Sequence, residues 1–268
     1  MVKSMNLNRI NWWAVFWGGL GLAYFFVPLY GTFDFSLRIV KGELSFLAYE
    51  KVFSDPRFLS SFRYSATMGV ITVIVSVLLF VPTTYWIHLR LPRLRPVMGM
   101  ITLLPFIIPA IVFVFGLIRT FSREPFLLTR TTFTTDILIT AGYVIVTMPY
   151  MFRAIDVGMG TIDIRTLTEA AQSLGANWFQ VLFRVIFPNL RIAILSGALI
   201  TFATVVGELI LADFLVRPAL GPYMVNINQT KLYEPAALGI LSFGFTWICL
   251  GLIQFFSRGR ANQQLTGR

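Results

Sequence analysis

The sequence has few charged residues. Only 13% of its 268 residues are charged, 56% are hydrophobic, and the mean hydropathy is +0.75. A soluble domain of this size carries roughly 25% charged residues. Because so little polar surface could not cover a soluble globule, the composition predicts an integral membrane protein. The net charge of +10 is spread over the ends of apolar runs, so we expect membrane lipid, and no nucleic acid, beside the basic residues.

Residues that commonly perform catalysis are also scarce. His88 is the only histidine, so a histidine-paired nucleophile or a multi-histidine metal site has little to build on, and we interpret it as an interfacial residue beside Arg90. Cys249 is the only cysteine, which excludes an internal disulfide, and we interpret it as a small buried apolar side chain. The sequence contains no H-E-x-x-H or G-x-S-x-G motif. These absences weigh against a membrane-embedded enzyme.

Long apolar runs dominate the sequence. A bilayer core requires about 20 apolar residues per helix, and six segments qualify, at about residues 12–32, 64–88, 97–118, 137–155, 192–213 and 236–256. The first run is too long for the ~7–15-residue core of a signal peptide, so we expect it to be retained. Only helices and closed barrels satisfy the backbone in lipid, and these runs are too long for barrel strands. We therefore expect an all-α membrane protein with six transmembrane helices in a single domain, residues 1–268.

Basic residues in the loops predict the orientation of these helices. If the N-terminus is inside the cell, slightly more than half of the Lys and Arg residues lie on the inner side. Half of the remaining ones lie in the longest outer loop, and long loops count little in this rule. We therefore expect a multi-pass protein with both termini in the cytoplasm.

A polar segment separates the fourth and fifth predicted spans. The stretch "TEAAQSLGANWFQVLFRVIFPN", residues 168–189, is a poor candidate for a span, and the predicted orientation puts it in the cytoplasm. Thr166 and Glu169 match a T-x-x-E capping box, and Asp163 is an alternative N-cap. Apolar residues then recur at helical spacing and predict one helix face, which comprises Ile164, Leu167, Ala171 and Leu174.

The second half of the segment predicts a turn and another helix. Gly175 suits the left-handed residue that ends a helix, and Asn177 can cap the helix that follows. The residues of that helix at helical spacing are Trp178, Val181, Leu182 and Val185. We therefore expect two short helices around a tight glycine turn, a compact protrusion on the inner face of the membrane that is suited to a cleft on a partner protein.

This segment resembles the EAA loop of ABC importer permeases, whose pattern is E-A-A-x3-G-x9-I-x-L-P. Glu169, Ala170, Ala171, Gly175 and Pro188 match the pattern, and its Ile and Leu positions hold valine and phenylalanine. The similarity in layout extends from about residue 12 to residue 256. It implies the type I importer permease fold, with an EAA loop at about residues 163–190. In that family the loop forms a cytoplasmic coupling helix between spans 4 and 5 that docks on an ATP-hydrolysing subunit.

The resemblance also implies site residues and partners. The docking residues would be Glu169, Ala170, Ala171, Leu174 and Gly175, with a purely local capping role as the alternative for Glu169. The expected partners are two ABC ATPase subunits, a second permease that is homologous or identical, and an extracytoplasmic substrate-binding protein, in the cytoplasmic membrane of a bacterium. No lysine follows a glycine, so the G-K-[ST] ending of a phosphate-binding loop is missing. We expect ATP and Mg²⁺ on the ATPase and no cofactor on this chain.

Two acidic residues stand in or near the fifth predicted span. Glu208 lies in "VVGELILADF", at a depth where a carboxylate costs a few kcal/mol unless it is paired, solvated or protonated, and Asp213 lies nearer to water. We interpret both as candidates for the translocation path, although Glu208 could instead bond a neighbouring helix for structural reasons alone. The stretch "GEL" followed by "ADFL" resembles permeases of the polyamine, iron and phosphonate-type branch of the family, and "TKLYEPAALGILSF" is similar to the spermidine/putrescine group. The resemblance favours a polyamine, with opines and aminophosphonates as alternatives. A membrane-embedded enzyme and a channel are the rival functions.

Overall fold

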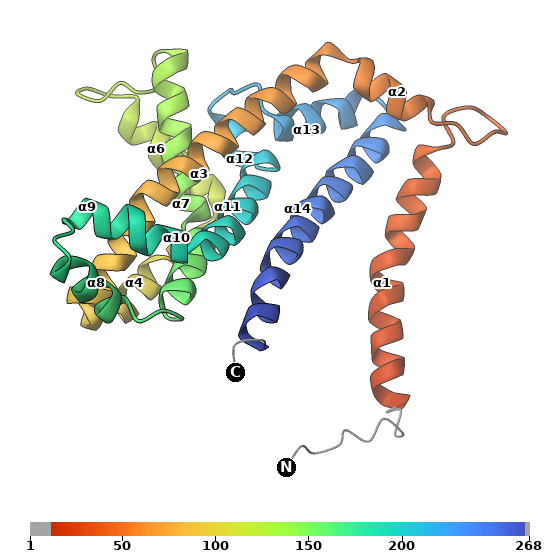
Figure 1. Cartoon of the computed structure of the whole chain (residues 1–268). Coiled ribbons are helices and arrows are strands. Elements are labelled where there is room, and N and C mark those ends of the chain that lie inside the picture. Colours follow the sequence, from red (N-terminus) through yellow and green to blue (C-terminus); the bar gives the residue numbers. More distant parts are fainter. Residues whose placement is uncertain (1–11, 266–268) are drawn as a thin grey trace. The chain divides into compact units, whose positions relative to one another are not determined.

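The computed structural model describes residues 12–265, with side chains described as far as Ile248. Over these residues the regular structure is helical, apart from one isolated bridge, so the all-α prediction is confirmed (Figure 1). The helices are, in order, α1 (Trp12–Ser36), α2 (Leu47–Ser54), α3 (Pro56–Arg90), η1 (Pro92–Leu94), α4 (Arg95–Ile101), α5 (Leu104–Ile107), α6 (Ala110–Phe121), α7 (Thr132–Met159), α8 (Ile164–Ser173), α9 (Trp178–Gln180), η2 (Val181–Ile186), α10 (Phe187–Asn189), α11 (Arg191–Val206), α12 (Ile210–Phe214), α13 (Leu220–Thr230) and α14 (Glu234–Leu265). The side chain of Cys249 lies outside the described residues.

Several helices are suited to cross a bilayer. α1, α3 and α7 are each long and apolar enough to form one span. Two bent pairs of helices would each qualify as one further span, so the described residues contain up to five spans. The bent pairs are Pro92–Ile107 with Ala110–Phe121, at 97°, and Trp178–Asn189 with Arg191–Val206, at 76°. The sixth predicted span, 236–256, falls on α14, part of whose side chains are not described, so the count of six stays a prediction.

Proline explains the break in the third predicted span, 97–118. α4 ends at Ile101, Pro105 occupies the first turn of α5, and Pro109 is the N-cap of α6. Proline lacks a backbone N–H and its ring collides with the preceding turn, so a straight helix does not form through this pair. Pro149 behaves differently, because it lies inside α7 without ending that helix.

The described chain divides into two compact units. The first comprises the described part of Met1–Asp55 together with Ile227–Phe243, and the second comprises the rest. In the first unit the hydroxyl oxygens of Ser36 and Tyr49 lie 2.8 Å apart and join the end of α1 to α2. None of the most apolar window of α1 is buried, as expected for a helix whose side chains contact lipid.

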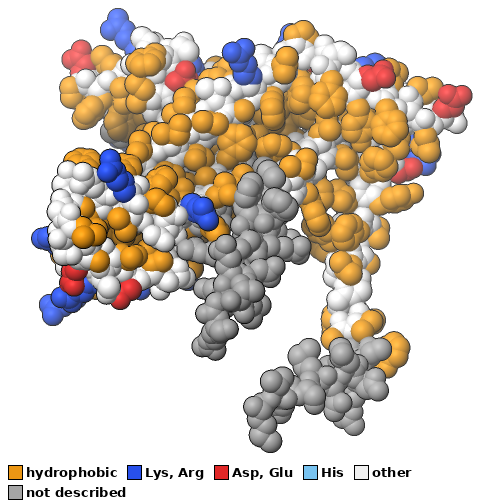
Figure 2. Space-filling model, viewed as in Figure 1, with side chains coloured by type: hydrophobic (Ala, Val, Ile, Leu, Met, Phe, Trp, Pro, Cys, Tyr) orange, Lys and Arg blue, Asp and Glu red, His pale blue; other side chains and the backbone are white. Residues whose placement is uncertain are grey.

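The second unit is built on α3, α7 and α11, which pack together. One buried apolar cluster joins these helices to α8 and η2, and its members include Tyr85, Ile155, Ile164 and Ile186. A separate cluster is centred on the first half of α7 and on α12. Hydrophobic side chains also cover much of the face shown in Figure 2, where charged groups are few. Apolar surface on this scale is typical of a protein that contacts lipid or other subunits.

Small residues bring α7 and α11 together. A Cβ atom added to Gly158 would collide with the Cβ of Ala193, and one added to Gly197 would lie 2.9 Å from the sulfur of Met151. Small residues at helix contacts allow two backbones to approach closely, which is a main source of helix association in lipid. The contact between α7 and α11 therefore depends on the missing side chains of two glycines.

We expect Gly158→Ala to destabilise the protein, because the added methyl group has no room beside Ala193. Overpacking of this kind costs about 1–3 kcal/mol, which would lower the midpoint of thermal unfolding in detergent. Gly116→Ala in α6 is the matched control, because nothing lies within 4 Å of its added Cβ. Equal midpoints for the two variants would contradict close packing of α7 on α11.

Candidate functional site

The predicted docking loop, residues 163–190, begins with a helix cap. The carboxylate of Asp163 accepts hydrogen bonds from the backbone N–H of Thr166 at 3.1 Å and from its hydroxyl at 2.8 Å. These bonds, the backbone one first, hold the pKa of the Asp163 carboxyl below its usual range. The alternative cap is therefore the observed one. The T-x-x-E capping box at Thr166 is wrong, because α8 begins at Ile164 and Glu169 lies in its second turn.

The charged residues of α8 face outward. Glu169 forms an ion pair with Arg165, with Oε1 and Nε 2.8 Å apart, and both side chains are exposed, so the pair adds little stability. Ala170 is exposed, whereas Ala171 is half-buried. Leu174 was predicted on the same face as Ala171 but is 88% exposed, because it follows the end of α8. The predicted docking residues thus present a carboxylate, a small side chain and an apolar tip.

Gly175 ends α8 in the left-handed conformation, as predicted. Its φ is +83°, its N–H donates to the carbonyl of Gln172 at 2.9 Å, and the N–H of Ala176 donates to the carbonyl of Ala171 at 3.0 Å. This pair of bonds is the Schellman arrangement, which satisfies the last carbonyl groups of a helix. The glycine therefore closes α8 and reverses the chain.

Asn177 caps the helix that follows, as predicted. Its side chain accepts from the N–H of Gln180, and the Gln180 side chain accepts from the N–H of Asn177, both at 2.9 Å. The helical segment Trp178–Asn189 comprises α9, η2 and α10, and η2 is a π-helix. Val181 and Leu182, two members of the predicted face, are buried. Both short helices therefore place an apolar face on the core of the second unit.

Two contacts join these helices to the end of α3. The hydroxyl oxygens of Tyr85 and Thr168 lie 3.0 Å apart, and both side chains are buried. Trp86 stacks on Trp178, with ring centroids 5.8 Å apart and planes at 25°. The guanidinium of Arg90 lies over the Trp86 ring, 5.1 Å from its centroid. Sequence reasoning missed these contacts, because no local pattern links α3 to a loop that lies about eighty residues further along the chain.

An ionic cluster around a buried carboxylate joins α3, α4 and α7 at the same end of the second unit. Asp156 of α7 accepts hydrogen bonds from Arg95 of α4 at 2.9 and 3.2 Å and lies 2.7 Å from Nε2 of His88 of α3. The side chains of Asp156 and His88 are 8% and 10% exposed. The interpretation of His88 as a residue of the membrane interface stays a prediction, and the structure places its imidazole against Asp156. A buried carboxylate requires partners of this kind, since an unpaired one is strongly destabilising.

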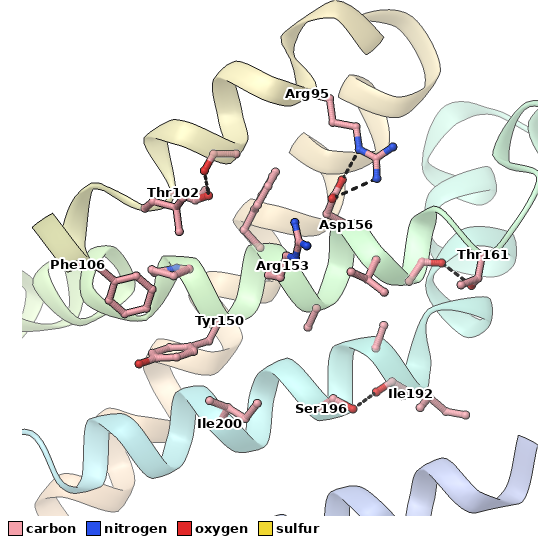
Figure 3. Close-up of a pocket in the computed structure, with 18 of the residues that line it drawn as sticks. Arg95, Thr102, Phe106, Tyr150, Arg153, Asp156, Thr161, Ile192, Ser196 and Ile200 are labelled. Carbon is pink, nitrogen blue, oxygen red and sulfur yellow. Dashed lines mark hydrogen bonds and ion pairs between the residues drawn. The ribbon is translucent and has the colours of Figure 1, made fainter.

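A cavity of about 1180 Å³ lies beside this cluster. In Figure 3, α4 and α5 flank it on one side and α11 on the other, with α7 between them. Its polar lining includes the ion pair of Arg95 and Asp156, the guanidinium of Arg153 and the hydroxyl groups of Tyr150 and Ser196. Arg153 is exposed to this space. The cavity can therefore hold a small solute against a mainly apolar wall with a few polar groups.

Glu208 occupies a break in the predicted fifth span. α11 ends at Val206, and the Glu208 carboxylate accepts hydrogen bonds from the N–H groups of Leu211, at 2.9 and 3.1 Å, and Ala212, at 3.2 Å. The carboxylate thus caps α12 and is half-buried. Asp213, within α12, is exposed. Neither residue lines the cavity beside Asp156, and their role in a translocation path stays a prediction.

A second cluster that sequence reasoning missed joins α3, α7 and the chain after α12. Asp136 accepts a hydrogen bond from the Tyr64 hydroxyl at 2.6 Å and pairs with Arg217 at 3.3 Å. Nearby, the N–H of Leu220 donates to the buried hydroxyl of Ser65 at 2.8 Å. The bonds of Arg217 and Leu220 fix the segment that follows α12 to α7 and α3, through partners 81 and 155 positions away in sequence.

The chain is similar to known components of membrane transport systems. The family model described as "Binding-protein-dependent transport system inner membrane component" matches residues 81–265. The spermidine/putrescine transport system permease protein PotB of Haemophilus influenzae is 28% identical over 162 residues, which are 56% of this chain and 56% of that protein. The PotB protein of Escherichia coli is 25% identical over 60% of this chain and 62% of its own length. This chain thus spans little more than half the length of the curated relatives that it matches.

Two further comparisons extend this result. The putrescine transport system permease protein PotI of Escherichia coli is 30% identical over 127 residues, which are 46% of this chain and 42% of that protein. A solved structure, described as a bacterial ABC transporter involved in the import of the acidic polysaccharide alginate, superposes with a TM-score of 0.64. It covers 92% of this chain and 94% of the other chain at 15% identity. Identity this low supports the same fold and nothing more specific.

The contact between Tyr85 and Thr168 can be measured by a double-mutant cycle. We expect Tyr85→Phe and Thr168→Val to show a coupling free energy of unfolding of about 1 kcal/mol, because each removes the same buried hydrogen bond. Chemical unfolding of the purified protein in detergent gives the four stabilities. The matched cycle pairs Tyr85→Phe with Thr72→Val, since the buried Thr72 hydroxyl has no hydrogen-bond partner among the described residues. Additive effects in both cycles would show that the Tyr85–Thr168 bond contributes nothing.

Proposed function

The chain belongs to the family of inner membrane components of binding-protein-dependent transport systems, and from that premise we propose that it is the membrane-spanning subunit of an ATP-driven importer. It is a multi-pass protein of the inner membrane, and in the proposed orientation both termini are cytoplasmic. The subunit moves a small solute inward by alternating access, with the energy supplied by ATP hydrolysis on another subunit. The chain itself breaks no bond in the solute.

We base this proposal on the way in which α8 is held. The inward side of α8 is fixed to the core by Ile164 and by the hydrogen bond between Thr168 and Tyr85. The outward side exposes Glu169, Ala170 and Leu174. A short helix that is capped at both ends and packed against the core on one side is suited to dock in a cleft of a partner. It can also pass a displacement to the helices on which it packs.

The proposed assembly has several subunits. Two ABC ATPase subunits bind ATP and Mg²⁺, and one of them docks on the EAA loop of this chain, whose docking residues are Glu169, Ala170, Ala171, Leu174 and Gly175. A second permease, homologous or identical, completes the translocation path, and an extracytoplasmic binding protein delivers the solute. The chain itself binds no cofactor. The similarity to binding-protein-dependent permeases supports this set of partners.

A polyamine is the solute class that the relatives named for spermidine and putrescine support best. The wall that this chain gives to the cavity holds two guanidinium groups, of Arg95 and Arg153, and one carboxylate, of Asp156. A polycation is repelled by such a wall unless other acidic groups face it. Because neither Glu208 nor Asp213 lines this cavity, we propose that the acidic groups facing this wall come from the second permease, and that Glu208 and Asp213 contact the solute elsewhere on the path.

Docking of the ATPase is tested by reversing the charge of one exposed carboxylate. We expect Glu169→Arg to reduce co-purification of the ATPase about tenfold or more, because loss of one charged docking contact costs at least about 1.4 kcal/mol. Glu43→Arg is the matched control, since Glu43 is also exposed but lies in the other unit. Gly175→Pro should have the same effect as Glu169→Arg, because proline cannot adopt the φ of +83°. Full retention of the ATPase by both loop variants would contradict the proposed function.

The role of Glu208 is tested by removing its charge while keeping an oxygen that can accept hydrogen bonds from α12. We expect Glu208→Gln to lower solute uptake several-fold with little change in assembly, because the cap on Leu211 survives and only the negative charge is lost. Glu208→Ala removes the cap as well and should also lower the thermal midpoint. Uptake in proteoliposomes, together with unfolding midpoints, separates the two effects. Unchanged uptake by the Gln variant would limit Glu208 to a capping role.

A further inference from the structure

The second helix of the docking loop carries a row of aromatic rings that the proposed function does not use. Phe179 and Phe183 stack with their centroids 6.4 Å apart and their planes at 3°, and Phe187 continues the row at 6.3 Å. The side chains of Phe179 and Phe183 are 65% and 47% exposed, whereas Val181 and Ile186, on the other side of the helix, are fully buried. An exposed aromatic row of this kind indicates an apolar environment outside the chain.

The course of the backbone places this helix relative to the membrane. The segment Trp178–Asn189 makes an angle of 76° with Arg191–Val206, and only Leu190 separates them. Figure 1 shows the stretch from α9 to α10 running across the unit before the chain turns into α11. If α11 crosses the bilayer with an ordinary tilt of roughly 20°, the preceding helix runs close to the plane of the membrane, and its C-terminal end meets the leaflet surface.

Basic residues accompany the aromatic row. Arg184 follows Phe183 directly, and Arg191 is the first residue of α11. Both are exposed, and the ion pairs among the described residues include neither of them. Helices that lie in a membrane interface combine Phe, Leu or Trp on one side with Lys or Arg at the headgroups. Basic side chains at the cytoplasmic leaflet are attracted to anionic lipids.

We propose that Trp178–Asn189 is an interfacial helix that binds the inner leaflet. The rings of Phe179 and Phe183 lie at the boundary between headgroups and acyl chains, and the guanidinium groups of Arg184 and Arg191 bind anionic lipid headgroups. This inference rests on the proposed function for the orientation of α11. The two halves of the loop then have different partners, because α8 offers a mainly polar surface to the ATPase and the aromatic helix holds the loop at the membrane.

The position of the aromatic row is tested with a nitroxide label in the complete transporter, in nanodiscs of phosphatidylethanolamine and phosphatidylglycerol. Cys249→Ala removes the native thiol, and Phe183→Cys carries the label. We expect oxygen, which concentrates in lipid, to relax this label more than a water-soluble nickel chelate does. Glu43→Cys, at an exposed position in the connection between α1 and α2, is the control, at which oxygen has no such advantage. A label at 183 that the chelate reaches freely, or that neither reagent reaches because protein covers it, would overturn the proposal.

The contribution of charge is tested by retention of lipid. We expect Arg184→Gln combined with Arg191→Gln to reduce the phosphatidylglycerol that stays bound in native mass spectrometry, with phosphatidylethanolamine unchanged. Arg123→Gln combined with Arg130→Gln makes the same change of charge in the connection between α6 and α7, where we expect no loss. Equal retention after the two double changes would show that the arginines beside the aromatic row have no special contact with anionic lipid.

The results for this helix and for the proposed function can be told apart. A transporter that keeps its ATPase but shows residue 183 in water contradicts the interfacial helix alone. A chain that never co-purifies with an ATPase contradicts the proposed function, whatever the label at residue 183 reports.

Discussion

The buried contact between the hydroxyl groups of Tyr85 and Thr168 determines which way the docking helix faces. Successive residues of an α-helix are rotated by about 100°, so a helix with one inward position has its outward positions set as well. Thr168 points inward together with Ile164, one turn earlier. Glu169 and Ala170, the next two residues, are therefore turned to the outside. The surface offered to a partner follows from a hydrogen bond on the opposite side of the helix.

Sequence reasoning predicted the parts of the loop that depend on near neighbours. Gly175 and Asn177 act through backbone bonds that reach at most five residues along the chain, and such signals are visible in a sequence. The N-cap of α8 was harder to predict, because Asp163 and Thr166 both match a capping pattern. In the structure α8 begins at Ile164, whose side chain packs in the core, so Asp163 is the residue in the N-cap position. Leu174 fits the apolar spacing but stands beyond the end of the helix, so it is exposed.

The remaining features depend on residues far apart in the sequence. His88 and Arg95 meet Asp156 across 68 and 61 positions, and no periodicity of one helix reports such a meeting. Glu208 shows the converse case. From the hydropathy of the sequence we predicted one continuous span at residues 192–213. In the structure Gly207 ends α11, and the Glu208 carboxylate caps α12. Composition could predict that the chain is helical and lies in a membrane, but it could not show where a polar group finds its partner.

The same long-range contacts decide what a push on α8 would move. Asp156 joins α7 to α3 and α4, and Gly158, half a turn further along α7, leaves no free space against α11. Closely packed interiors transmit displacement instead of absorbing it. Under the proposed function, a displacement of α8 therefore passes to α3 through Tyr85 and from there to α4 and α7. The cavity is lined by residues of α4, α5, α7 and α11. A subunit docked on α8 can therefore change the shape of the cavity without contacting the residues that line it.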